Sequence, residues 1–348
     1  MNVLRRSRRR EPEPLRPVVF RWDLDKTYLK SAFDSLRGLV RIPFEKPQDK
    51  ITVPGVVPLI RGLRNVANQR GREVRIYFIS ASPPQIAKAI KEKLALDGIE
   101  YDGIVFKNQL QHLVRGKFRN LREHVGYKLT ELLKSRREMP VGSQEVLFGD
   151  DWESDPIIYS LYADILAGRV GAAALDGILG TIGVDPLLIT TAKALAAEVS
   201  PAEVVRKIYI NIERRTPPTS FRSFGARLVP SFNYFQTAVC LFDDGQLTLP
   251  AVVEVATGLI NDASYTPNRL ANSLADVVRR GHLQEPSAIA VREYLAARGL
   301  LPPRRRDGVR PSLWDRLVRW LRTQPNPPPP SEVAINYETL VTEWRAAR

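Results

Sequence analysis

The amino-acid sequence predicts an α/β protein built on a doubly wound, Rossmann-like parallel sheet. Short apolar segments rich in β-branched and aromatic residues alternate with segments that carry apolar residues at helical spacing. This alternation is typical of parallel sheets with helices on both faces. Several apolar segments also end directly at a residue whose polar side chain could act in catalysis or ligand binding. This is expected where ligands bind at the carboxyl ends of parallel strands.

The predicted elements follow one another in a regular order. The first strand covers residues 17–22 and ends directly before Asp23. Next come a helix over 58–69, a strand over 74–79, a helix over 83–96, a strand over 101–106, a helix around 128–134, a strand over 145–148 and a helix over 156–166.

The second half of the chain predicts a mostly helical extension with one further strand. Residues 171–204 read as an apolar helical insertion, 207–213 as a strand, 247–261 and 268–280 as helices, and a short helix is expected around Trp344. We therefore expect a basic tail over 1–16, one domain over 17–300 with its core motifs in 17–170, and a Pro/Arg-rich tail over 301–348 with short amphipathic helices. Residues 325–330 should be extended polyproline.

Composition limits the function classes. The chain has 348 residues, 52 Lys and Arg against 38 Asp and Glu, and a net charge of +14, which favours an anionic partner. Cys240 is its only cysteine, which excludes an internal disulfide and a thiolate metal site. No apolar signal segment follows the basic tail, and Asp176, Asp185 and Lys193 interrupt the most apolar stretch, so we expect a cytoplasmic protein without a transmembrane segment.

The pair Asp23 and Asp25 is the first candidate for catalysis. Phosphate esters resist attack because their charge repels nucleophiles, and a carboxylate held in line can overcome this. Asp23 would attack phosphorus, while Asp25, two residues on in an extended segment, would protonate the leaving oxygen and later activate water. Such a pair also binds metal in sugar-nucleotide transferases or forms turns and helix caps, so it does not decide the chemistry alone.

Three further residues are candidates for phosphate binding. Thr27 would order the loop that follows the first strand. Ser80 would donate a hydrogen bond from the end of the second strand, and Lys128 would neutralise the phosphate and the nearby carboxylates. Lys117 and Lys134 compete with Lys128, whose position before the fourth strand favours it.

The acidic cluster after the fourth predicted strand indicates a metal site. Carboxylates crowded behind a buried strand repel one another unless a cation is present. Mg²⁺ prefers oxygen ligands, so Asp23, Asp25, Asp150 and Asp155 are the predicted ligands. Asp151 is the weaker candidate in this cluster and is expected to face solvent.

Taken together, these motifs resemble those of the haloacid dehalogenase superfamily over residues 17–170. The segments Val53-Pro54-Gly55-Val56, Tyr77 to Pro83, Lys128, and Gly149 to Tyr159 more narrowly resemble the actin-patch-type phosphatidate phosphatase catalytic domain. This resemblance implies that Asp23 is a nucleophile, Asp25 an acid and base, Ser80 and Lys128 phosphate ligands, and Asp150 and Asp155 magnesium ligands. Lys26 and Asp151 depart from the family's motifs.

The spacing also limits substrate size. About fifty residues separate the first two strands, and the gap before Lys128 is short, so no large cap domain fits and an open site is expected. We expect a phosphatase for a lipid phosphate at an anionic membrane surface. The amphipathic segment 312–322 could bind peripherally there, although packing on its own domain is the favoured interpretation of this helix. The alternatives are a phosphatase for nucleic-acid ends or phosphoproteins, and a catalytically silent binding module on the same fold.

Overall fold

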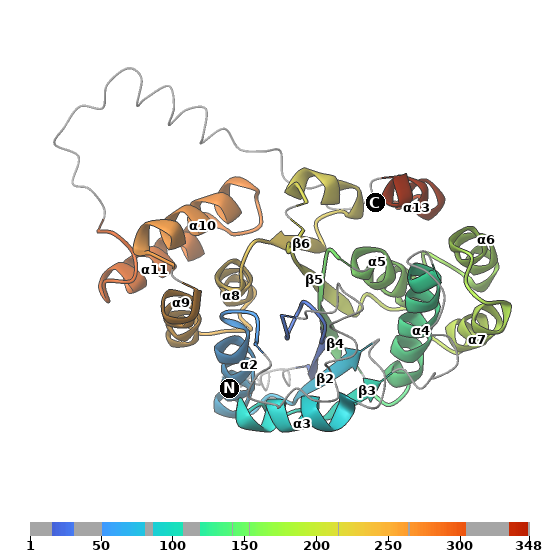
Figure 1. The fold of residues 1–348 in the computed structure, drawn as a ribbon, viewed down its shortest axis with the longest axis horizontal. Coiled ribbons are helices and arrows are strands. Elements are labelled where there is room, and N and C mark those ends of the chain that lie inside the picture. Colours follow the sequence, from blue (N-terminus) through green and yellow to red (C-terminus); the bar gives the residue numbers. More distant parts are fainter. Residues whose placement is uncertain are drawn as a thin grey trace, which may run out of the picture.

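A six-stranded parallel sheet forms the centre of the protein (Figure 1). The computed structural model describes residues 16–30, 51–80, 86–106, 119–140, 142–152, 154–214, 216–263, 265–303 and 334–346. The strands are β1 (Val18–Asp23), β2 (Val74–Ser80), β3 (Gly103–Phe106), β4 (Gln144–Asp150), β5 (Val205–Asn211) and β6 (Leu228–Ser231). Their order in the sheet is β3-β2-β1-β4-β5-β6, which confirms the predicted Rossmann-like fold class.

The strand order places a binding crevice beside the first strand. The sheet grows from β1 through β2 to β3 on one side and through β4 to β5 and β6 on the other, so the order reverses between β1 and β4. In open α/β sheets, ligands bind at such a reversal, outside the carboxyl ends of the strands. Asp23 and Asp150 are the last residues of β1 and β4.

Helices cover both faces of the sheet (Figure 1). Alternate side chains of β4 enter opposite cores, with Phe148 in one and Leu147 in the other. The first core also receives α2 (Val56–Arg70), α3 (Ala87–Leu96), α8 (Tyr234–Asp243), α9 (Leu249–Ala263), α10 (Pro267–Arg279) and α11 (Glu285–Ala296). The second receives α4 (Arg119–Arg136), α5 (Asp155–Leu166), α6 (Ala172–Ile182), α7 (Pro186–Ala197) and α13 (Tyr337–Ala346).

The apolar stretch predicted as a helical insertion over 171–204 is helical and forms two helices, α6 and α7. Gly183 ends α6 in the left-handed conformation with φ 79°, and Pro186 begins α7 behind Asp185, whose carboxylate accepts from the Leu187 N–H. Both helices belong to the long connection from β4 to β5, and α7 packs on α4. The stretch therefore extends the helical layer on one face of the sheet.

The helix expected around Trp344 is α13, and it packs against α5 and α6. Tyr337 anchors it, because its hydroxyl donates to the buried carboxylate of Asp164 over 2.6 Å. Residues 1–15 of the basic tail predicted over 1–16 lie outside the described residues, as do the polyproline segment and the amphipathic segment 312–322.

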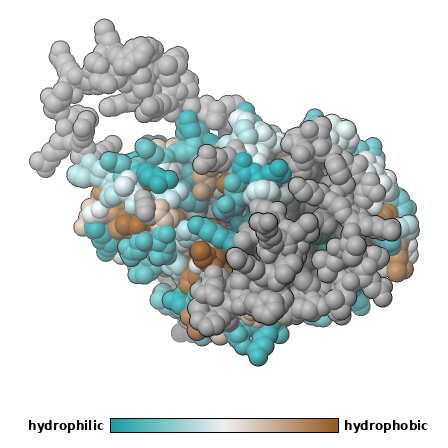
Figure 2. All heavy atoms as spheres, viewed as in Figure 1, coloured by the Kyte–Doolittle hydropathy of each residue, from teal (hydrophilic) through white to brown (hydrophobic). Residues whose placement is uncertain are grey.

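Two observations bear on membrane contact. Within the described ranges, no helix has the length and apolar composition needed to cross a membrane. The face shown in Figure 2 is mostly hydrophilic outside the grey atoms, and its hydrophobic residues form scattered patches. Between β1 and β2, the described residues form a single helix, α2.

Candidate active site

Three strands of the sheet end at polar residues that lie side by side. Asp23, Ser80 and Asp150 are the terminal residues of β1, β2 and β4, which are neighbours in the sheet. Asp23 is paired with Ile79, the residue before Ser80. All three residues are buried. The sheet thus brings together polar groups that are separated by up to 127 positions in the sequence.

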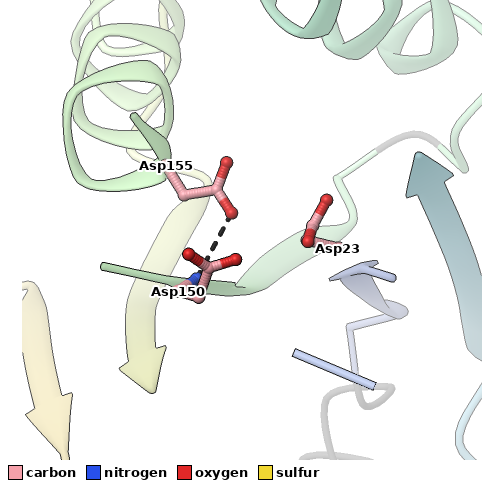
Figure 3. A group of neighbouring side chains, drawn as sticks. All are labelled: Asp23, Asp150 and Asp155. Carbon is pink, nitrogen blue, oxygen red and sulfur yellow. Dashed lines mark hydrogen bonds between the residues drawn. The ribbon is translucent and has the colours of Figure 1, made fainter. Parts of the chain in front are cut away.

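A group of three carboxylates forms the centre of the site (Figure 3). One oxygen each from Asp23, Asp150 and Asp155 lies within 4.8 Å of the others, and all three residues are buried. Asp155 is the first residue of α5, and its Oδ2 accepts from the backbone N–H of Asp150 at 3.3 Å. The turn between β4 and α5 therefore folds Asp155 back beside the end of β4.

Gly149 makes this close approach possible. A Cβ atom at this position would lie 2.6 Å from Cβ of Asp155 and 2.7 Å from Cε2 of Tyr159. Both neighbours are fully buried, so α5 would have to move away from the end of β4.

Gly149→Ala is therefore expected to destabilise the protein by about 1 to 3 kcal/mol and to displace Asp155. Gly180 is a suitable control because a Cβ atom there meets nothing within 4 Å inside α6. Gly180→Ala should stabilise by up to about 1 kcal/mol through helix propensity. Urea unfolding of both variants measures the difference, and equal effects would show that packing at Gly149 is loose.

Lys128 is the cation of the site. Its Nζ lies 2.7 Å from Oδ1 of Asp23 and 2.7 Å from Oδ1 of Asp155, and its side chain is fully buried on α4. Of the two competing lysines, Lys134 is exposed and pairs with Glu131, while Lys117 lies outside the described residues. The structure thus brings Lys128, and not Lys134, to the carboxylates.

Asp25, also a predicted metal ligand, is not part of this group of three carboxylates as the described residues form it; it contacts Ser80, the last residue of β2. The Ser80 hydroxyl donates to Oδ2 of Asp25 over 3.3 Å. Asp25 retains 8% exposure, the largest among the candidate site residues. The loop after β1 bends back here: Lys26 adopts a left-handed φ of 59°, and Asp25 bridges to Leu29.

The burial of the site differs from the sequence-based expectation. An open site was expected, yet Asp23, Ser80, Lys128, Asp150 and Asp155 are all fully buried. The loop after β1 contributes Leu24, Thr27 and Tyr28, which are also fully buried. This loop is therefore packed into the core, and the five site side chains are buried in the structure.

Thr27 is held in the loop by its backbone. Its carbonyl accepts from the Tyr234 hydroxyl over 2.6 Å. Its buried Oγ1 has no hydrogen-bond partner among the described residues. Tyr234 of α8 thus fixes the loop through the backbone of residue 27. Loop ordering and phosphate binding by the Thr27 side chain stay predictions.

Asp151 does not face solvent, contrary to expectation. It is 1% exposed, and its carboxylate accepts from the backbone N–H groups of Glu213 and Arg214 over 2.8 and 3.0 Å. The Thr216 hydroxyl donates to it over 2.6 Å. Asp151 thus anchors the loop after β5. The sequence did not reveal this role because the partners lie more than sixty positions away.

Sequence reasoning also missed Asn211, at the end of β5. Its side-chain amide donates to the carbonyl of Lys26 over 3.2 Å and to Oε1 of Glu213 over 2.9 Å. The same rule that identified the other strand ends would have identified it if the strand had been predicted to end two residues earlier. Asn211 links the loop after β1 to the loop after β5.

The charges of the buried group favour a divalent cation. With Asp23, Asp150 and Asp155 ionised and Lys128 protonated, the formal charge of these four residues is −2. Burial of unbalanced charge is costly, so a cation that carries two positive charges fits this group. The donor atoms are carboxylate oxygens, which suit Mg²⁺.

Tyr159 contributes no charge of its own. Burial raises the pKa of its phenol well above the usual value, and the nearby Asp155, Asp23 and Asp150 raise it further, although Lys128 acts in the opposite direction. Its hydroxyl therefore stays neutral and donates to the carbonyl of Phe148 at 3.4 Å.

Magnesium should stabilise the folded protein if these carboxylates bind it. At a concentration one hundred times the dissociation constant, the free energy of unfolding should rise by about 2.7 kcal/mol. Urea unfolding with magnesium chloride and with a chelator measures this gain. The gain should disappear in Asp150→Asn and persist in Asp176→Asn, whose carboxylate lies on the exposed side of α6. An equal gain in both variants would place the ion elsewhere.

The site lies in a segment that is similar to a known catalytic domain. Residues 22–175 match the family model of the catalytic domain of phosphatidate phosphatase APP1. The matched segment contains every residue of the buried group, and it ends within α6. Neither the curated proteins nor the solved structures yield a match for this chain.

Proposed function

We propose that this protein is a magnesium-dependent phosphomonoester hydrolase with a haloacid dehalogenase-type site. Its substrate would be phosphatidate or a related lipid phosphate, met at a membrane surface by a cytoplasmic protein that binds peripherally. The observation that supports this most strongly is that Lys128 contacts both Asp23 and Asp155 at the reversal of strand order. The similarity of residues 22–175 to a phosphatidate phosphatase domain supports the substrate class.

In the proposed reaction, the Asp23 carboxylate attacks phosphorus, and the bond from phosphorus to the lipid oxygen breaks. The Asp25 carboxyl group gives its proton to that oxygen, which releases a neutral alcohol. Asp25 then takes a proton from water as the water oxygen attacks the aspartyl-phosphate, which frees phosphate and restores Asp23. Every proton that Asp25 gives is returned in the second step.

The neighbouring residues would hold the charges during this sequence. Lys128 compensates the negative charge of Asp23 and Asp155, and Ser80 orients Asp25 through its hydroxyl. Asp23, Asp25, Asp150 and Asp155 would hold the magnesium ion. When bound, the ion would supply positive charge against the phosphate oxygens.

One substrate comparison tests the proposal. Phosphate release is measured with magnesium from phosphatidate vesicles, a phosphopeptide and an oligonucleotide with a terminal phosphate. We expect release from phosphatidate that stops when a chelator is added. Release from the oligonucleotide or the phosphopeptide alone would overturn the lipid assignment. No release from any of the three would favour the silent binding module.

The role of Asp25 predicts a dependence on the leaving group. Asp25→Asn should slow hydrolysis of phosphatidate by about 10² to 10⁴ because an alkoxide leaves poorly without a proton. For a nitrophenyl phosphate, whose leaving group needs no proton, the rate of the first step should fall far less in this variant. Burst kinetics on both substrates separate the two steps. Equal losses in the first step would show that Asp25 does not act as the acid.

A further inference from the structure

Cationic and aromatic side chains follow the ends of four neighbouring strands. Lys26 follows β1, Trp152 follows β4, Arg214 follows β5 and Phe232 follows β6. We call these four residues the strand-end rim. Because β1, β4, β5 and β6 are consecutive in the parallel sheet, the strand ends extend over roughly 14 Å of one edge.

The rim is connected directly to the carboxylates of the site. The backbone N–H of Trp152 donates to Oδ1 of Asp150 over 2.5 Å. Nζ of Lys26 lies 3.4 Å from the centroid of the Trp152 ring, and Cζ of Arg214 lies 4.8 Å from it. Two cations from different strand ends thus contact one indole ring, beside the residue that ends β4.

Hydrogen bonds fix the backbone of the rim. Asn211 holds the carbonyl of Lys26, and Asp151 holds the backbone N–H of Arg214. Phe232 precedes Asn233, the N-cap of α8, and its own N–H donates to the side chain of Gln236 over 2.8 Å. The rim is therefore built on residues whose positions the sheet and α8 determine.

The rim side chains remain accessible although the site beneath them is buried. Phe232 is 43% exposed, and Arg214 is exposed as well. Lys26 and Trp152 are half-buried. Glu213, an acidic residue on this edge, is exposed and accepts a hydrogen bond from Asn211.

The loop after β1 continues the same combination of side chains. Lys30 is exposed, and its backbone N–H donates to the carbonyl of Ile51 over 2.8 Å. Ile51 is 66% exposed, the second largest exposure among the large hydrophobic side chains of the described residues. An exposed aliphatic residue therefore lies beside a lysine on the loop that carries Asp25.

We infer that the strand-end rim binds the surface of an anionic bilayer. Lysine and arginine near a membrane are attracted to anionic lipid, and partly exposed aromatic rings suit the level of the headgroups. The inference rests on the proposed function in one respect: binding of the rim to a bilayer would bring a lipid phosphate to the strand ends, where the proposed reaction takes place. The occupant is the bilayer itself, through the phosphodiesters of its lipids.

Vesicle binding tests the inference without any hydrolysis. The probe is phosphatidylcholine vesicles with and without phosphatidylglycerol, which is a diester and therefore no substrate for a phosphomonoesterase. The test variant is Arg214→Gln with Phe232→Ser. The control is Arg206→Gln with Leu187→Ser, because Arg206 is exposed near the opposite end of β5 and Leu187 is 74% exposed on α7.

The full chain should bind the phosphatidylglycerol vesicles and lose binding at high salt. The test variant should bind roughly tenfold more weakly, while the control binds like the wild type. Thermal unfolding verifies that both variants are folded. Equal vesicle binding by the test and control variants would overturn the inference. It would also be overturned if the test variant lost binding to a phosphopeptide or an oligonucleotide but kept binding to vesicles. If rim-dependent binding occurs without any phosphate release, the inference stands and the proposed function fails.

Discussion

Asp23→Asn is expected to lower phosphate release from phosphatidate by about four orders of magnitude or more. The amide nitrogen and oxygen cannot replace a carboxylate as the nucleophile, and the loss of a covalent nucleophile is among the largest single effects in enzymes. The variant should still fold, because asparagine keeps the shape of the side chain and lowers the excess negative charge beside Asp150 and Asp155. Its free energy of unfolding should stay within about 1 kcal/mol of the wild type or rise.

The same variant tests the covalent step. After rapid acid quenching, wild type incubated with radiolabelled phosphatidate should retain label on the protein, and Asp23→Asn should retain none. Asp176→Asn makes the same chemical change on α6 and should behave as the wild type. Full activity of Asp23→Asn would mean that water attacks phosphorus directly and that Asp23 only binds the ion.

Lys128→Met is expected to destabilise the protein by about 3 to 5 kcal/mol, because it leaves buried carboxylates without their cation. In this variant, Asp23 and Asp155 each lose their ion pair with Lys128, at 2.7 Å, and both carboxylates are fully buried. Magnesium should recover part of the loss, since the group then carries a greater negative charge. Activity should fall as well, because Lys128 also positions the Asp23 carboxylate.

Lys134→Met is the matched control on the same helix. Lys134 is exposed, and it pairs with Glu131 one turn away, so its loss should cost at most about 0.5 kcal/mol. Chemical unfolding of both variants, with magnesium and with a chelator, measures the two effects. A Lys128→Met variant as stable as Lys134→Met without magnesium would show that the carboxylates are not ionised together.

The sequence predicted the sheet's first five strands because their signals are local. β1, β2 and β4 are apolar runs that end at Asp23, Ser80 and Asp150, and parallel strands with connecting helices leave few arrangements for such ends. The grouping of Asp150 with Asp155 could be predicted because Asp155 lies only a short turn from Asp150. These inferences needed no knowledge of distant contacts.

Elements with weaker local signals were missed. β6 has four residues and contains Pro230, which argues against a strand, and the structure places it at the edge of the sheet, where proline is tolerated. α8 has no regular polar face, since Tyr234 to Leu241 are all buried, so the helical period is hidden. α11 was not predicted either. The anchoring roles of Asp151 and Asn211 depend on partners far along the chain and could not be read locally.

The hydrogen bond from Tyr234 to the carbonyl of Thr27 has a consequence for how the catalytic unit should be delimited. The family match ends at residue 175, yet Tyr234 and Asn211, which lie beyond it, hold the loop that follows Asp23. A fragment cut at residue 175 would lose these supports and leave one side of β4 without its neighbouring strand. The smallest fragment that keeps the candidate site intact should therefore extend beyond residue 175 and include β5 and α8.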